Sequence, residues 1–254
     1  MSALSRRQFL KMTALALPAA VVIDTRLVEP TNLRVTHLQP NPNGTTRFIH
    51  FTDFHHKGDT TYADKVVRTI NELKPEFVCF TGDLVEDTKY LDEALHFIAQ
   101  IKTPVYGSPG NHDYWCGAPF SEYERVFSAT GGRWLVDDNL ILPERDLELV
   151  GMGRDGAPML KPRQATRRFL LTHYPKSVED LGDQKFDWIM AGHSHGGQVR
   201  IPGYGAIALP WGVGRYDLGY FETEAGPLYV NAGIGTYRIP WRFNCRPEIT
   251  LVTI

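Results

Sequence analysis

The chain lacks the features of a disulfide-built or nucleic-acid-binding protein. Its 254 residues carry a formal net charge of −2, which gives no basic footprint for nucleic acid. The three cysteines are widely spaced and odd in number, so they outline no disulfide framework, and a Cys116–Cys245 bridge stays open. Cys79 lies inside an apolar run, which predicts that it is buried. The chain also has no internal repeat and no low-complexity tract, and 43% of its residues are hydrophobic, as in an ordinary globular domain.

The chain also lacks an apolar run long enough to span a membrane. Its most conspicuous apolar stretch, Met12–Ile23, has 12 residues, whereas a spanning helix needs about 20. Directly before it, the segment 5–11 reads Ser-Arg-Arg-Gln-Phe-Leu-Lys, which matches the twin-arginine export consensus at every fixed position. This combination predicts a signal segment and not a conventional transmembrane helix.

The leader implies a partner and a location. We expect the twin-arginine machinery to export the folded protein to the periplasm or to the outer face of the inner membrane. Residues 1–33 are therefore interpreted as leader and linker, and residues 34–254 as one catalytic domain. Cleavage of the leader stays open, and so does peripheral association with the membrane through an uncleaved leader.

Five short fragments supply the side chains of a predicted metal site. Their histidine nitrogens and carboxylate and amide oxygens are the donor mixture that suits Zn, Mn or Fe, whereas structural zinc sites are rich in thiolates. The fragments are, in chain order, Asp53-Phe54-His55, Gly82-Asp83, Gly110-Asn111-His112-Asp113, Thr172-His173 and Gly192-His193-Ser194-His195-Gly196-Gly197.

Each fragment follows an apolar, β-prone run, and helical patterns separate the first three runs. The first pattern places Tyr62, Val66, Ile70 and Leu73 on one face, and a second one spans residues 91–101 with Leu91, Leu95, Ile98 and Ile101. A β-α-β-α-β order predicts parallel strands, whose carboxyl ends meet at one edge of a sheet. The predicted strands are 48–52, 77–81, 105–106, 169–171 and 188–191.

From residue 133 onward the pattern consists mostly of strands. The expected segments are 134–136, 140–142, 147–150, 207–209 and 228–230. The predicted fold class is therefore α/β, a four-layer α/β/β/α sandwich of two mixed sheets.

The order of these fragments resembles the calcineurin-like metallophosphoesterases. The resemblance runs from Phe48 to the C-terminus, and the Gly-Gly-Gln at 196–198 and the ending 242–250 are similar to its bacterial YaeI/YkuE-type branch. Phe54 and Ser194 stand where the familiar fragments have Leu and Thr, and neither is a ligand position.

The resemblance implies two divalent metal ions, with Mn, Zn or Fe expected. One would be held by Asp53, His55 and His195, and the other by Asn111, His173 and His193, with Asp83 as the bridge. A metal-bridging hydroxide would then attack a phosphate ester.

The resemblance also implies roles beside the metals. His112 would face the scissile phosphate. From there it can protonate the leaving oxygen or stabilise developing charge, and the adjacent Asp113 is a candidate to orient its imidazole. Trp115 and Tyr174 are weaker hypotheses for substrate contacts because they directly follow site fragments. Histidines without such context are interpreted as structural or surface residues, and acidic residues 86 and 87 as a solvated loop; the histidines are His37, His50, His56 and His96.

The preferred function is hydrolysis of a phosphate ester, with a phosphodiester favoured. One alternative is a UDP-2,3-diacylglucosamine pyrophosphatase, although an exported domain argues against a lipid made on the cytoplasmic side. The non-enzyme alternative is a metal-binding scaffold, but such proteins usually lack the histidine that is present here as His112. The physiological substrate, the native metal and the oligomeric state stay open.

Overall fold

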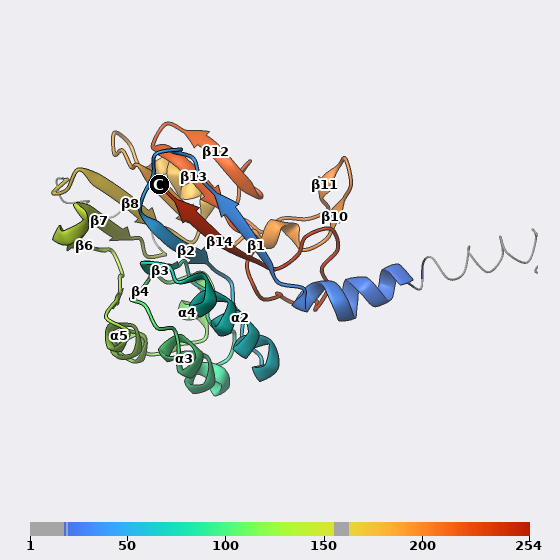
Figure 1. Cartoon of the computed structure of the whole chain (residues 1–254). Coiled ribbons are helices and arrows are strands. Elements are labelled where there is room, and N and C mark those ends of the chain that lie inside the picture. Colours follow the sequence, from blue (N-terminus) through green and yellow to red (C-terminus); the bar gives the residue numbers. More distant parts are fainter. Residues whose placement is uncertain (1–17, 19, 155–162) are drawn as a thin grey trace, which may run out of the picture.

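Two six-stranded mixed sheets form the centre of the molecule (Figure 1). The computed structural model describes residues 18, 20–154 and 163–254. In the first sheet all neighbouring strands are parallel except β14 and β2. In spatial order its strands are β1 (Arg34–Leu38), β14 (Glu248–Thr253), β2 (Arg47–Phe51), β3 (Phe77–Phe80), β4 (Val105–Gly107) and β5 (Arg133–Trp134).

The second sheet has a parallel centre and an antiparallel strand at each edge. In spatial order its strands are β12 (Gly219–Thr223), β13 (Gly226–Val230), β9 (Trp188–Ala191), β8 (Arg167–Leu171), β7 (Leu147–Gly151) and β6 (Asp138–Leu142). A small separate hairpin pairs β10 (Arg200–Ile201) with β11 (Gly205–Ala206).

The alternation of side chains along the strands builds the layers. On β3, Phe77 and Cys79 face the core between the sheets, while Val78 and Phe80 face the helices. On β8, Phe169 likewise lies in the core between the sheets. Because both faces of the central strands are covered, β3 and β9 are apolar throughout, as the sequence suggests.

Helices cover the outer face of the first sheet (Figure 1). Asp59 caps the first of them by accepting a hydrogen bond from the backbone N–H of Tyr62 at 3.0 Å. The apolar faces expected for the first two helices are buried or packed against the core. The helices are α2 (Thr60–Leu73), α3 (Leu91–Ala99), α4 (Asn111–Trp115) and α5 (Phe120–Ala129), with the 3₁₀ turns η3 (Thr88–Tyr90) and η4 (Pro143–Arg145).

The outer face of the second sheet has a thinner cover. The 3₁₀ helix η5 (Pro175–Asp180) contributes Val178 to a third core cluster, which also contains Leu170 and Ile189 of the sheet. The predicted α/β class with two mixed sheets is confirmed, and in the described residues the α-helical layer is concentrated on the first sheet.

Some predicted strand positions are wrong. Residues 207–209 form no strand, and Ile207 is 58% exposed, because this apolar run lies on the surface and not in a sheet. The strand expected at 134–136 is the short β5, which ends at Trp134. Strands β1, β12 and β14 were not expected at all.

The first described residues form a helix attached to one side of the domain (Figure 1). Residues 20–23 are helical and continue into η1 (Asp24–Val28) and η2 (Glu29–Thr31). The backbone N–H of Arg242 donates to the Thr25 carbonyl at 2.9 Å, which ties this segment to the C-terminal part. The segment 5–11 lies outside the described residues, and the division at residue 33 stays a prediction. Among the described residues, no helix is long and apolar enough to cross a membrane.

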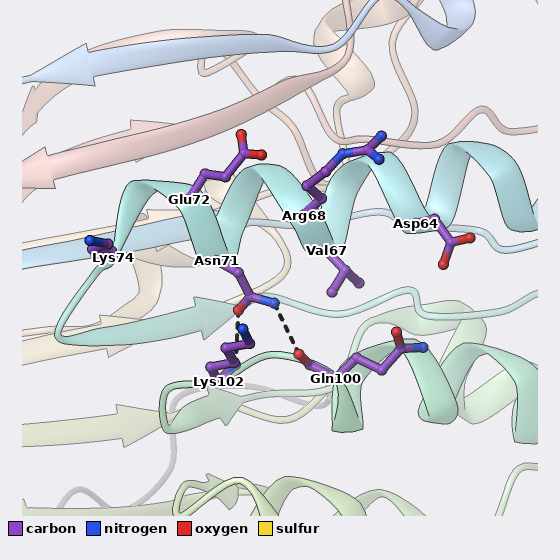
Figure 2. A pocket seen from close by; sticks show the side chains of 8 residues that line it. All are labelled: Asp64, Val67, Arg68, Asn71, Glu72, Lys74, Gln100 and Lys102. Carbon is purple, nitrogen blue, oxygen red and sulfur yellow. Dashed lines mark hydrogen bonds between the residues drawn. The ribbon is translucent and has the colours of Figure 1, made fainter.

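A surface groove of about 650 Å³ lies between α2 and the chain that follows α3 (Figure 2). The carboxamide of Asn71 spans it by donating to the Gln100 carbonyl at 3.0 Å and accepting from the backbone N–H of Lys102 at 2.9 Å. None of the predicted site residues lines this groove.

Candidate metal centre

The loops that follow the strands are held together by backbone hydrogen bonds. The N–H of Asp53 donates to the Gly82 carbonyl at 2.9 Å, and the N–H of His55 donates to the Asp83 carbonyl at 3.0 Å. A link between the sheets is made by the N–H of His193, which donates to Asp53 Oδ2 at 2.9 Å. Fragments from both sheets thus meet at one place, as the sequence predicts.

Glycines allow the close approach of these loops. A Cβ on Gly82 would lie 2.2 Å from the backbone nitrogen of Gly110, and Gly82 has a φ of +92°. A Cβ on Gly192 would lie 2.4 Å from Asp53 Oδ2. Any side chain at these positions would push the loops apart.

Backbone strain is concentrated at the same residues. Eleven non-glycine residues of the described chain have a positive φ, and five of them belong to the predicted metal ligands. Such conformations cost of order 1–3 kcal/mol each and persist only where the surroundings enforce them. The five residues are Asp53, His55, Asp83, His193 and His195.

Asp53, His55 and His195 form a buried group, which we call the first half-site. His195 Nε2 lies 3.1 Å from His55 Nε2 and 3.3 Å from Asp53 Oδ1. Behind the group, His55 Nδ1 lies 3.1 Å from Glu86 Oε1. Two donors each about 2.0–2.2 Å from one cation lie roughly 3–3.5 Å apart, so these spacings fit a shared metal.

The second half-site consists of Asn111, His173 and His193. His193 Nδ1 lies 3.1 Å from His173 Nε2, the same spacing as in the first half-site. The other ring nitrogens face backbone carbonyls: His173 Nδ1 lies 2.7 Å from the oxygen of Thr81, and His193 Nε2 lies 2.7 Å from that of Trp211. Donation to these carbonyls leaves the facing nitrogens free to bind a metal.

Asp83 lies between the two half-sites. Its Oδ2 is 3.1 Å from His173 Nε2 and 3.5 Å from His55 Nε2, so one carboxylate contacts a histidine of each half-site. Its Oδ1 accepts a hydrogen bond from the backbone N–H of His112 at 2.7 Å. The neighbouring Asn111 is buried, and its Oδ1 has no hydrogen-bond partner among the described residues.

The donor set fits divalent cations. An orphaned buried amide oxygen and facing pairs of imidazole nitrogens are unfavourable without a positive charge between them. Burial opposes protonation of His55 and His173, yet contacts with Asp53 and Asp83 outweigh it and raise the pKa of each histidine to about 9. The pKa of His195 is lowered to about 3 by burial. The carboxylates therefore attract positive charge that a metal would supply.

His112 lies beside the half-sites. Its backbone bonds to Asp83, and its ring lies 4.9 Å from that of His55 and 4.8 Å from that of Tyr237, measured between centroids. Burial lowers its pKa, so its imidazole is neutral at neutral pH. The ligand atoms of His112, His55 and Asp83 lie within 4.8 Å of one another, so its imidazole lies directly beside two of the proposed metal ligands.

Asp113 does not orient His112 in this structure. Its carboxylate accepts hydrogen bonds from the backbone N–H groups of Asp83 at 2.7 Å and Leu84 at 3.0 Å, and from the hydroxyl of Tyr123 at 2.9 Å. It is a fully buried residue of α4, and its carboxylate joins two loops in place of the expected contact with the imidazole. Burial beside Asp83 raises its pKa to about 6.

The two aromatic candidates both lie near the site histidines. The ring of Trp115, which is 62% exposed, packs 4.9 Å from that of His112. The ring of Tyr174 packs 4.6 Å from that of His193. These positions are compatible with substrate contacts, which stay predictions.

Three contributors to the site were missed by the sequence reasoning. Glu86 was interpreted as part of a solvated loop, but it backs His55 and also contacts Lys57. Tyr237 packs against the site rings, and Trp211 contributes only its carbonyl. No spacing signal marks these residues, because their loops meet the motifs only in the tertiary fold.

Arg242 is a further missed residue, and it supports the site from behind. Its buried guanidinium donates to the carbonyls of Ala232 at 2.9 Å and Gly233 at 3.0 Å. A Cβ on Gly233 would lie 2.8 Å from the Asp53 Cβ, so the loop held by Arg242 packs directly on a predicted ligand.

The remaining predictions on histidine and cysteine have clear outcomes. His50 and His56 are buried structural residues, and His56 pairs with Glu93. The three cysteines are all free, so no Cys116–Cys245 bridge is present. Cys79 is fully buried as expected.

Comparison with known proteins shows which protein family the sequence matches. The sequence model of the calcineurin-like phosphoesterases matches residues 46–197. The chain is 30% identical to an uncharacterised metallophosphoesterase, YkuE of Bacillus subtilis, over 100% of this chain and 99% of that one. It is 31% identical to the phosphodiesterase YaeI of Escherichia coli over 72% of each chain. It is also 26% identical to the UDP-2,3-diacylglucosamine pyrophosphatase LpxG of Chlamydia trachomatis over 94% of each.

Proposed function

Because the chain belongs to the calcineurin-like phosphoesterases and is a metal-dependent phosphohydrolase, we propose that it hydrolyses phosphodiesters at a dinuclear metal centre. The observation that carries the proposal is the pair of half-sites joined by Asp83. The likeness to the phosphodiesterase YaeI supports the diester preference.

The two half-sites assign the ligands. The first half-site would hold one cation and the second half-site the other, and the Asp83 carboxylate contacts a histidine of each half-site. When bound, two divalent cations neutralise phosphate oxygens and lower the pKa of a coordinated water. The negative charge of Asp83 would reduce the mutual repulsion of the two cations.

His112 acts on the substrate and not on the metals. Its neutral imidazole would donate an N–H hydrogen bond to the oxygen on which charge develops as the ester bond breaks, whereas the protonated imidazolium would be needed to transfer a proton to the leaving group. The bond from its backbone to Asp83 fixes its position relative to the centre. Asp113 joins the loops that carry these two residues and so holds the arrangement together.

A chromogenic assay tests the activity. Metal-loaded protein is expected to hydrolyse bis(p-nitrophenyl) phosphate faster than p-nitrophenyl phosphate, with no turnover after chelation. Turnover of the monoester alone would overturn the diester preference. No turnover of either ester by protein that holds two equivalents of metal would favour the scaffold alternative.

The pyrophosphatase remains a second candidate because the likeness to LpxG covers nearly the whole of both chains. Release of UMP from UDP-2,3-diacylglucosamine by the purified protein would support it. A rate on this lipid that exceeds the rate on simple diesters would replace the preferred function.

We also propose export by the twin-arginine pathway, supported by the Ser-Arg-Arg-Gln-Phe-Leu-Lys segment and the apolar stretch after it. The variant Arg6→Lys/Arg7→Lys is expected to remain active in lysates but to be absent from the periplasm. Both residues precede β2 by about 40 residues in sequence and belong to none of the proposed half-sites. Unchanged fractionation of this variant would refute the pathway and strengthen the case for the cytoplasmic lipid substrate.

A further inference from the structure

Large apolar side chains are exposed on segments that reach the metal centre. We propose that this surface, called the apolar rim, docks the protein onto the surface of an anionic phospholipid bilayer. Its most exposed members are Trp211 at 86%, Tyr204 at 77% and Ile207 at 58%. The rim comprises Ile201, Tyr204, Ile207, Leu209, Trp211, Ile239 and Trp241.

The exposed large hydrophobic side chains are not scattered evenly along the described chain. Fourteen large hydrophobic residues of the described chain are exposed, and seven of them form the rim. Five more lie on the N-terminal helical segment 20–28, and the two others are Trp115 and Tyr220. Scattered apolar residues on a surface are ordinary, whereas such a grouping marks an interaction surface.

Backbone hydrogen bonds place the segments that carry the rim and the N-terminal helix next to one another. The N–H of Ile207 donates to the Val199 carbonyl at 3.2 Å, and the N–H of Arg200 donates to the Phe243 carbonyl at 2.9 Å. The N–H of Arg242, next to Trp241, donates to the Thr25 carbonyl at 2.9 Å. Figure 1 shows the β10–β11 hairpin and the blue N-terminal helix extending from the same side of the domain.

Charge selects a lipid surface as the occupant. The segments 198–216 and 231–247, which carry the whole rim, contain no aspartate or glutamate. Arg215 and Arg238 are exposed in them and can meet lipid phosphates. Tryptophan, tyrosine and isoleucine side chains next to arginine are typical of protein surfaces that bind at the boundary between lipid headgroups and acyl chains.

The N-terminal segment supports the same occupant. The apolar run that begins at Met12 reaches the domain through Val21, Val22 and Ile23, which are 41–59% exposed. A second apolar element beside the rim would enter the same bilayer, and two membrane contacts bind far more firmly than one.

Docking at the rim would bring lipid headgroups close to the metal centre. The rim residue Trp211 offers its carbonyl to His193, and Tyr237, which precedes the exposed loop 238–241, packs on His112. The proposal goes beyond the phosphoesterase function and does not depend on it, because binding to vesicles is measured without turnover.

Sedimentation with vesicles tests the docking. The full chain is expected to sediment with phosphatidylcholine vesicles that contain phosphatidylglycerol, and more weakly at high salt. The triple variant Tyr204→Ser/Ile207→Ser/Trp241→Ser should lower the partition coefficient by roughly tenfold or more, because it removes most of three apolar side chains from the contact. The control Tyr220→Ser, on the edge strand β12, should bind like the wild type. Hydrolysis of a soluble ester should be equal in all three proteins.

A fluorescence measurement separates the rim from the N-terminal segment. Brominated lipids should quench the tryptophan emission of vesicle-bound protein, and Trp241→Phe should reduce that quenching. Absence of tryptophan quenching in the vesicle-bound wild type, or a triple variant that binds like the wild type, would overturn the proposal by showing that the rim does not hold the protein on the bilayer. A wild type that ignores vesicles, but forms a dimer that the triple variant loses, would assign the rim to a second copy of the chain.

Discussion

The two half-sites use similar donors but are held in different ways. In the first, His55 is backed by the side chain of Glu86. In the second, His173 and His193 are both backed by backbone carbonyls. A side-chain anchor can be removed by one substitution, whereas a carbonyl anchor remains whatever residue provides it. The comparison teaches that the ligand types alone do not say how robust each half of the centre is.

The two half-sites also share an electrostatic rule. Each contains one histidine whose pKa is raised to about 9 beside a carboxylate and one whose pKa burial lowers, to about 3 for His195 and about 4 for His193. The buried Asp53 and Asp83 therefore draw one positive charge toward each half. A divalent cation in each half-site would supply this positive charge, and twice as much of it as a protonated histidine.

Removing the shared carboxylate should have the largest effect. Asp83→Ala is expected to lose metal from both half-sites and to reduce turnover to background, because one carboxylate contacts both. Elemental analysis should give nearly two equivalents in the wild type. Asp87→Asn, in an exposed loop nearby, should keep both metals. A wild-type plateau at one equivalent that is unchanged in Asp83→Ala would contradict the bridging assignment.

His112 lies beside both half-sites, and its substitution should not change the metal content of either one. His112→Gln is expected to keep both metals and lose roughly 10²–10⁴-fold in turnover, the usual contribution of an acid–base group. The loss should shrink for esters with good leaving groups, which need little protonation. If the variant loses metal along with activity, His112 is itself a metal ligand and must be added to the residues of the half-sites.

Glu86 tests the difference in anchoring directly. Glu86→Gln is expected to weaken metal binding at the first half-site by about 10–100-fold, as removal of a partner of a metal-binding histidine does elsewhere. Trp211→Phe keeps the carbonyl that faces His193 and should leave the second half-site unchanged. Competition with a chelator measures both. Equal affinities in wild type and Glu86→Gln would show that the two anchors do not differ in importance.

Substitution of the buried His50, behind the first half-site, should have the smallest effect, and that effect is on the pH dependence of the free energy of unfolding. Burial lowers its pKa to about 3, so folding opposes its protonation. Its contribution to stability is complete above the unfolded pKa of about 6.5 and is lost as pH falls toward 3. Between pH 7.5 and 5.5 the wild type should lose about 1.4 kcal/mol more unfolding free energy than His50→Gln. Urea titrations at both pH values measure this difference, and identical losses would mean that His50 titrates normally in the folded state.

Much of the first sheet could be read directly from the sequence. The apolar runs before Asp53 and Asp83 and the helix between them are strong local patterns, and they correspond to β2, α2 and β3. The run at 207–209 has the same local appearance as a strand but has no partner, so it lies exposed on the rim. Local pattern cannot distinguish the two, because burial of a strand depends on neighbours that are distant in the sequence.

The sequence by itself predicts the ligand types, their order along the chain and the strand ends that carry them, because each proposed ligand follows a local apolar run within a few residues. It also predicts an export leader, and that prediction rests on the residues 5–23 alone. Only the tertiary structure decided that Glu86 backs His55, that Asp113 joins two loops and that Arg242 supports the loop behind Asp53. These contacts join segments that meet through the packing of two sheets, and no periodicity in one segment records which side chain of another segment will face it.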